Sequence, residues 1–198
     1  MSIDKFKKAL KHGGARSNLF RVSWELSKVG GNLEAPSGTV APGETGAKLL
    51  NFMCRATTLP TSSLTAIDVN YQGRVVKLAG VRPAFEDWTV TVINDEDMKI
   101  RRDLENWMEL INGTESNRRN GGVNNDMATY KCDNVRVESL SKTGEETVIG
   151  GYELIGAFPT NLGEVTLDWS NDTIQEYTVT FSFDYFKGLN KYDPKGNG

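Results

Sequence analysis

The chain has 198 residues, of which 38% are hydrophobic and 25% charged, and its formal net charge is -3. A domain of this length buries roughly 70% of the surface that its unfolded chain exposes, so one domain with one core is predicted over residues 1–198. The chain has no long basic run. It therefore lacks the charge pattern of proteins that hold nucleic acid by its phosphates, and any contact with DNA is expected to be transient.

Membrane and secretion signals are missing from the sequence. No apolar run approaches the roughly 20 residues of a membrane span, and the first residues lack the apolar core of a signal peptide. We therefore expect no membrane insertion, and folding in a cytoplasm. Cys54 and Cys132 are far apart and outside any CxxC spacing, which favours reduced, buried thiols over a disulfide.

Residues 1–14 are predicted to begin with a short amphipathic helix. Ile3, Phe6 and Leu10 recur at helical spacing among lysines, and two glycines follow as a stop. The pattern leaves two placements open for the apolar stripe of this helix: on its own domain, or docked on a neighbouring subunit.

Alternation of apolar and polar residues with a period of two predicts strands along most of the remaining chain. These strands are predicted at residues 19–29, 51–57, 67–71, 74–79, 85–93, 129–137, 147–158, 165–169 and 177–185. Gln72-Gly73 is predicted to join one antiparallel hairpin and residues 170–172 another. The expected fold is mainly β, an antiparallel β-sandwich or barrel. The aromatic residues on the apolar sides of these strands and of the helix described next are expected in the core, not stacked on bases: Trp24, Trp88, Trp107, Trp169, Tyr177, Phe181 and Phe183.

One longer helix is predicted to flank the sheet at about residues 95–111. Asn94 or Asp95 is the expected N-cap, and Glu96 and Asp97 are expected in the first turn, where the helix dipole favours acidic groups. Three segments are predicted to lie outside the regular elements: a long loop or projecting hairpin at 30–48, an exposed loop at 113–128 and a flexible tail at 187–198.

The sequence offers few residues that are suited to catalysis. His12 is the only histidine and lies in a lysine-rich terminal segment. The acidic run Asp95, Glu96 and Asp97 is explained by a helix start, and no EF-hand spacing follows it. Common phosphate, dinucleotide, zinc-protease and acyl-transfer motifs do not occur. We therefore expect no enzyme, no cofactor and no bound metal.

Three separated segments resemble one known family. Residues 15–22 (ARSNLFRV), 85–97 (FEDWTVTVINDED) and 159–186 (PTNLGEVTLDWSNDTIQEYTVTFSFDYF) are similar to the tail tube protein of long-tailed contractile bacteriophages. The resemblance implies a virion protein whose hexameric rings stack into a hollow tube inside a contractile sheath. It implies that double-stranded DNA and a tape measure protein pass through this tube. Sheath, baseplate and tail terminator proteins are further implied partners, and no catalytic residues accompany the resemblance.

A sheet with polar strand faces can hide its edges by closing a ring of identical copies, which places those faces around a bore. Lysine and arginine around a bore would hold DNA, so a neutral or acidic lining is expected. Strand alternation predicts this lining at Asp68, Asn70, Thr178, Thr180, Ser182 and Asp184. The N-terminal helix and residues 30–48 are expected to contribute contacts between subunits.

Two other functions are compatible with the sequence pattern. One is the inner tube subunit of a contractile injection system that delivers a toxin or acts as a bacteriocin. The more remote one is a monomeric β-barrel that binds a small ligand, for which an apolar internal pocket is expected.

Overall fold

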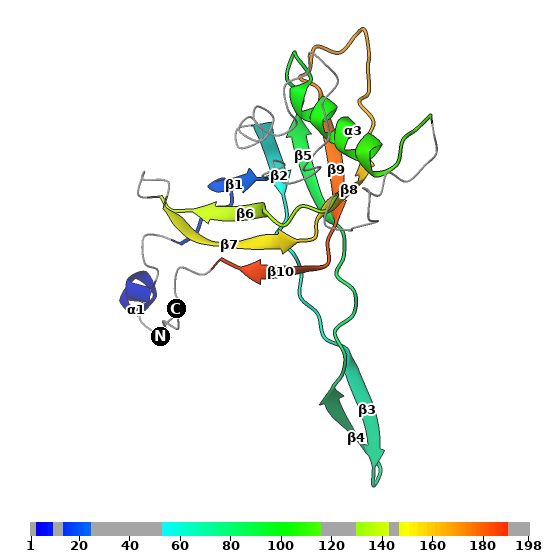
Figure 1. Ribbon diagram of the computed structural model, residues 1–198. Helices are drawn as coiled ribbons and strands as arrows, with labels where there is room; N and C mark the ends of the chain where they lie inside the picture. The colour runs from blue at the N-terminus through cyan, green and yellow to red at the C-terminus, as the bar shows by residue number, and fades with distance from the viewer. Residues whose placement is uncertain (1–2, 10–13, 25–52, 116–129, 143–146, 190–198) are drawn as a thin grey trace, which may run out of the picture.

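The computed structural model describes residues 3–9, 14–24, 53–115, 130–142 and 147–189 (Figure 1). Within them, the strands form two four-stranded antiparallel sheets and a separate two-stranded hairpin. Sheet 1 has the order β1-β6-β7-β10, and its strands are Phe20–Ser23, Val135–Leu140, Val148–Ile155 and Tyr185–Gly188. Sheet 2 has the order β2-β5-β9-β8, and its strands are Cys54–Thr57, Trp88–Ile93, Glu176–Ser182 and Phe158–Leu162. The predicted mainly β, antiparallel fold is confirmed.

The core lies between the sheets and is centred on Phe181. Alternate residues of β5 and β9 are buried, and they face each other as Trp88 with Phe181, Val90 with Val179 and Val92 with Tyr177. The Phe181 ring centroid lies 5.6 Å from that of Trp24, 5.5 Å from that of Trp88 and 6.2 Å from that of Trp107. These aromatic residues are therefore in the core as predicted. Phe183 is half-buried and packs against the edge of the core.

Helix α3, Lys99–Ile111, packs on the core face of sheet 2 beside β8. Ile100, Leu104 and Trp107 are its buried residues, and Trp107 Nε1 donates to the Tyr130 carbonyl at 2.8 Å.

The predicted start of this helix is wrong by several residues. Glu96 and Asp97 precede α3, and no acidic residue lies in its first turn. Asp95 still supports the helix, because its Oδ1 accepts the backbone N–H of Lys99 at 3.0 Å. The acidic run therefore lies in the loop before the helix, and Asp95 is its member that bonds the first residue of the helix.

The hairpin of β3, Ala66–Tyr71, and β4, Arg74–Ala79, projects away from both sheets (Figure 1). Its turn is formed by Gln72 and Gly73 with φ of 47° and 79°. Two consecutive left-handed residues match the right-handed twist of the flanking strands, and glycine adopts this conformation without steric cost. The predicted hairpin is confirmed, and both of its faces are exposed.

The predicted strand at residues 165–169 and its hairpin with β9 are wrong. Residues 163–175 form a loop, and β9 pairs with β5 and β8. Asp168 Oδ1 accepts the Ser170 backbone N–H at 2.9 Å and its hydroxyl at 2.7 Å, so the chain turns where a strand would continue. Trp169 lies in this turn and is fully exposed. The prediction that it lies in the core is therefore wrong.

The predicted strand at residues 177–185 is split between the two sheets. β9 ends at Ser182 in sheet 2, and β10 begins at Tyr185 in sheet 1. Asp184 lies at the crossing, where its N–H donates to the Ile155 carbonyl at 3.0 Å and its carboxylate pairs with Lys131. β10 continues to Gly188, so the first two residues of the predicted tail belong to a strand.

Helix α1, Ile3–Ala9, confirms the predicted N-terminal helix. Ile3 and Phe6 are 71% and 64% exposed, which argues against the placement on its own domain. His12, residues 30–48 and most of 113–128 lie outside the described residues. No helix in the described ranges has the length and apolar character to cross a membrane.

Candidate functional site

The outer face of sheet 2 carries a row of threonines. On β5 and β9, the residues between the buried ones are paired across the strands as Thr89 with Thr180 and Thr91 with Thr178. Ala56 of β2 lies opposite Thr91, and Asn161 of β8 lies opposite Thr180. We call these six residues the threonine face. All of them have small, uncharged side chains.

The threonine face points away from the core. The core cluster includes the buried residues of sheet 1, of α3 and of the opposite face of sheet 2. Thr89 and Thr178 are exposed, while Thr91 and Thr180 are half-buried. Since sheet 1 and α3 both pack on the other side, nothing in the described part of the chain covers this hydroxyl-bearing face.

Charge at the border of this face is paired. The Arg55 guanidinium forms an ion pair with Glu176, the residue where β9 begins. Beyond the other end of β9, the Asp184 carboxylate binds Lys131 Nζ at 2.7 Å. The face is thus bounded by neutralised pairs at both ends of β9.

The structure brings only half of the predicted lining residues together. Thr178, Thr180 and Ser182 follow one another along β9. Asp68 and Asn70 lie on the projecting hairpin, where Asp68 pairs with Lys77 at 2.9 Å, and Asp184 lies at the crossing between sheets. Sequence reasoning did not propose Thr89 and Thr91 as lining residues, although the alternation in residues 85–93 places them on the polar side of their strand.

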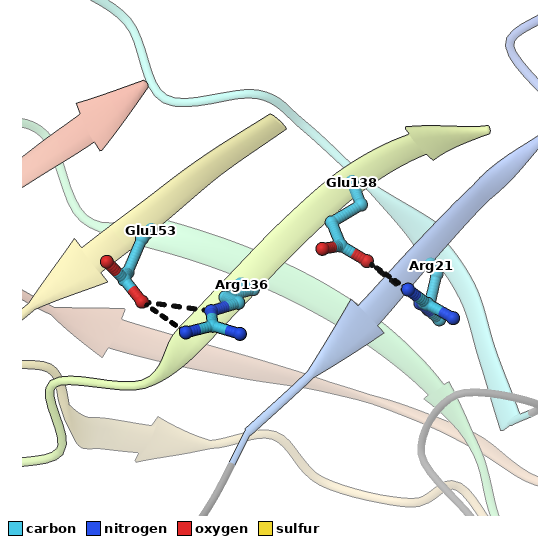
Figure 2. Close-up of polar contacts among 4 residues, drawn as sticks. All are labelled: Arg21, Arg136, Glu138 and Glu153. Carbon is cyan, nitrogen blue, oxygen red and sulfur yellow. Dashed lines mark hydrogen bonds and ion pairs between the residues drawn. The ribbon is translucent and has the colours of Figure 1, made fainter. Parts of the chain in front are cut away.

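Sheet 1 presents a different outer surface, with ion pairs across its strands (Figure 2). Arg21 of β1 binds Glu138 of β6 at 2.6 Å, and Arg136 of β6 binds Glu153 of β7 at 2.8 Å. Glu138 is only 9% exposed, so its charge depends on Arg21 for compensation. The two sheets therefore offer surfaces of contrasting chemistry, one hydroxyl-rich and one charged.

Titratable groups near the sheets have structural partners. Asp95 caps α3, and Asp97 pairs with Lys99, whose hydrogen bond and charge lower the pKa of the Asp97 carboxyl. Burial raises the pKa of the Cys54 thiol to about 11, which lowers its already small thiolate fraction at neutral pH further. Across the described ranges, no three His, Cys, Asp or Glu side chains gather closely enough to hold a metal ion.

The fold and its surfaces define a structural subunit with an uncovered neutral sheet face and a projecting hairpin. The chain belongs to the phage tail tube protein family, whose sequence profile matches residues 15–188. It is 35% identical over 189 residues to the tail tube protein gp19 of Enterobacteria phage T4, covering 94% of this chain and 100% of that one. The tail tube protein of Serratia phage KSP90 is 29% identical over 189 residues, covering 95% and 96%.

Solved structures with a similar fold come from contractile injection systems. A chain of the PVC sheath-tube complex in the extended state superimposes with a TM-score of 0.58 at 15% identity, covering 96% of this chain and 99% of that one. A chain of the anti-feeding prophage tube-terminating cap gives a TM-score of 0.56 at 14% identity, covering 89% and 91%. At these identities the likeness concerns the fold alone.

Proposed function

We propose that this protein is the wall subunit of a phage tail tube, in which hexameric rings stack inside a contractile sheath. DNA and a tape measure protein pass through the bore into the host. Membership of the tail tube family supports the assembly, and the observation that carries the proposed orientation is the uncovered threonine face. In this orientation sheet 2 lines the bore and the charged face of sheet 1 is turned away from it.

The physical reason lies in the charge of the cargo. Double-stranded DNA carries one negative charge for roughly every 1.7 Å of its axis, and each cation that binds it releases counterions. A lysine on every subunit would be repeated around each ring and along the tube, so weak attractions would add up to retention. Threonine hydroxyls hydrate the wall and carry no charge, so they add no electrostatic attraction for the phosphates.

The edges of sheet 2 suit closure of a ring. Among the described strands, β2 and β8 are the outer members of this sheet. An exposed edge strand has unpaired backbone groups, and joining β8 of one subunit to β2 of the next would pair them around a shared barrel. The threonine face of every copy would then point inward.

Charge introduced into the face tests this orientation. We expect a Thr91→Lys, Thr178→Lys variant to form tubes but to eject DNA more slowly at low salt, with recovery as salt is raised. A Thr91→Gln, Thr178→Gln variant is the matched control for size, and it should eject at the wild-type rate. Equal ejection by both variants, or a tube reconstruction with these threonines on the outer wall, would overturn the orientation.

The finer features of this role are also part of the proposal. Sheath, baseplate and tail terminator proteins contact the tube, which is assembled in the host cytoplasm and remains in the virion tail. The fold likeness to a sheath-tube complex supports a sheath partner. A wall that conducts its cargo requires no catalytic residue, cofactor or metal, and no insertion into a membrane.

A second candidate is the inner tube of a contractile injection system, which the fold likeness favours. The two roles differ in cargo. Particles purified from producing cells and treated with nuclease should retain protected DNA if the chain serves a phage tail. Particles with a protein effector and no DNA would support the injection device.

The third function, a monomeric β-barrel that binds a small ligand, has less support. It requires an apolar pocket, whereas the described space between the sheets is filled by the aromatic cluster around Phe181. A monomer at high concentration in the presence of nucleating partners would favour it.

A further inference from the structure

We propose that the β3–β4 hairpin of one subunit docks on the loop 163–175 of a second copy in the next ring, forming the axial contact of the tube. This inference rests on the proposed function, because it requires stacked rings. It is carried by two exposed apolar surfaces, their positions in the fold and their opposite charges.

One face of the hairpin is apolar and uncovered. Register pairs place Ile67 opposite Leu78 and Val69 opposite Val76, with Tyr71 at the end of the same face. Their exposed fractions run from 42% for Val69 to 65% for Tyr71. An isolated two-stranded hairpin is at best marginally stable in water, and packing against another element stabilises it. This apolar face therefore needs a cover that the described part of its own chain does not provide.

The loop 163–175 presents the second apolar surface. Leu167, Trp169 and Ile174 are 76%, 105% and 71% exposed. They border an open hollow of about 810 Å³, which Arg55 and Glu176 also line. The hydrogen bonds of Asp168 to Ser170 fix the turn at Trp169, so the exposure of the indole is built into the local backbone. Exposed tryptophan beside a hollow is typical of a protein interface.

The two surfaces lie at opposite ends of the same strands. Trp88 pairs with Phe181 at one end of β5, and Ile93 pairs with Glu176 at the other. The hairpin leads into the Trp88 end and the loop leads into the Glu176 end, and Figure 1 shows them at opposite ends of the subunit. When copies are placed end to end along the direction of these strands, the hairpin of one copy meets the loop of the next. A contact of this head-to-tail kind does not close on itself and continues as an open stack.

Charge favours the pairing of unlike surfaces over like ones. The hairpin with its stem, residues 64–82, has Arg74, Lys77 and Arg82 against the single acid Asp68. The loop has Glu164, Asp168 and Asp172 and no basic residue. Two hairpins or two loops in contact would bring like charges together, whereas hairpin and loop attract each other. The occupant that fits the loop is therefore the hairpin of another copy.

The test uses full-length protein under conditions in which the wild type forms tubes, with electron microscopy and sedimentation as readouts. We expect Trp169→Ala, Arg74→Glu and Glu164→Arg each to leave single rings intact and to raise the critical concentration for tube growth at least about tenfold. Combining Arg74→Glu with Glu164→Arg should restore growth to within about threefold of wild type, since the two surfaces then again carry opposite charges at these positions. Ile149→Ala, which removes a 51% exposed apolar side chain of β7 that belongs to neither surface, is the control and should grow normally.

Circular dichroism and thermal unfolding of each variant establish that the subunit is folded, and the altered side chains are exposed, so no loss is expected. Variants that grow tubes as the wild type does would overturn the docking, as would folded variants that lose rings as well as tubes, because the contact would then lie within a ring. A double variant without restoration would overturn the pairing of hairpin with loop. Absence of rings and tubes from the wild type would instead overturn the proposed function, and the docking with it.

Discussion

Replacing Gly151 by alanine measures how tightly sheet 1 is built around its buried ion pair. Gly151 is a buried residue of β7, directly opposite Glu138 on β6. A Cβ added there would lie 2.5 Å from the Val137 carbonyl oxygen and 3.0 Å from the Glu138 Cα. Both atoms belong to the backbone of a strand that is paired on each side, so they cannot move as a side chain would. β6 and β7 would have to separate locally.

The magnitude follows from this overlap. Forcing a methyl group into a packed site costs about 1–3 kcal/mol. For a chain of this size, each kcal/mol shifts the melting temperature by about 2–4 °C, so Gly151→Ala should lower it by about 2–12 °C. Gly150 is the matched control, because a Cβ there meets no atom within 4 Å. Gly150→Ala should raise stability by about 0.4–1 kcal/mol through the restricted unfolded chain.

Thermal and urea unfolding of the unassembled subunit, followed by circular dichroism, measures both variants against the wild type. Equal urea slopes would show that the change lies in the free energy of unfolding and not in the surface exposed. Two results would contradict a steric clash between β6 and β7: Gly151→Ala melting with the wild type, or Gly150→Ala losing as much stability as Gly151→Ala. The second outcome would mean that any side chain added to this strand is unfavourable, independent of the contact with β6.

Three further expectations concern single side chains. Glu138→Ala removes the carboxylate that compensates Arg21 and should lower the free energy of unfolding by about 1–3 kcal/mol, with a smaller loss for Glu138→Gln, as measured by the urea midpoint. Trp107→Phe keeps an aromatic ring but loses the hydrogen bond to the Tyr130 carbonyl, so a loss of at least about 1 kcal/mol is expected in the same assay. The Cys54 thiol has a pKa of about 11 against an ordinary 9.0, so at pH 8 its thiolate fraction is about a hundredfold lower than that of a free thiol. Alkylation of the folded protein should be correspondingly slow at pH 8 and accelerate toward pH 11, whereas fast labelling at pH 8, comparable to that of the urea-unfolded chain, would contradict the burial. Because folding raises the pKa of this thiol, its protonated form favours the folded state. This contribution to the free energy of unfolding is fully present below pH 9 and is lost as pH rises through about 11.

Several elements could be predicted from sequence because local pattern and tertiary packing agree. β5 and β9 alternate between aromatic or branched residues and threonine, and the same alternation separates buried from exposed side chains in the structure. The β3–β4 turn has a glycine where a left-handed residue is needed. The stripe on α3 with Leu104 and Trp107 is the stripe that packs on the sheet.

The failures share one physical cause. Alternation shows which residues lie on one face, but it does not show whether the same chain covers that face. Leu167 and Trp169 alternate with polar residues as a strand would, yet the side chain of Asp168 satisfies the backbone locally and the segment forms an exposed loop. Likewise, apolar and polar residues alternate without a break over residues 177–185, although β9 belongs to sheet 2 and β10 to sheet 1.

The exposed surfaces also bear on how tube length is set. A self-complementary patch would join two copies and stop, because both patches would then be occupied. The hairpin and the loop 163–175 are instead unlike surfaces at opposite ends of β5 and β9. Every added ring therefore buries one kind of surface against the existing tube and leaves the other kind exposed for the next ring. Each step of growth is then equivalent to the last, and nothing in such a contact distinguishes a short tube from a long one. With this docking, length must be fixed by another component, which is the role expected of a tape measure protein inside the bore and a terminator at its end.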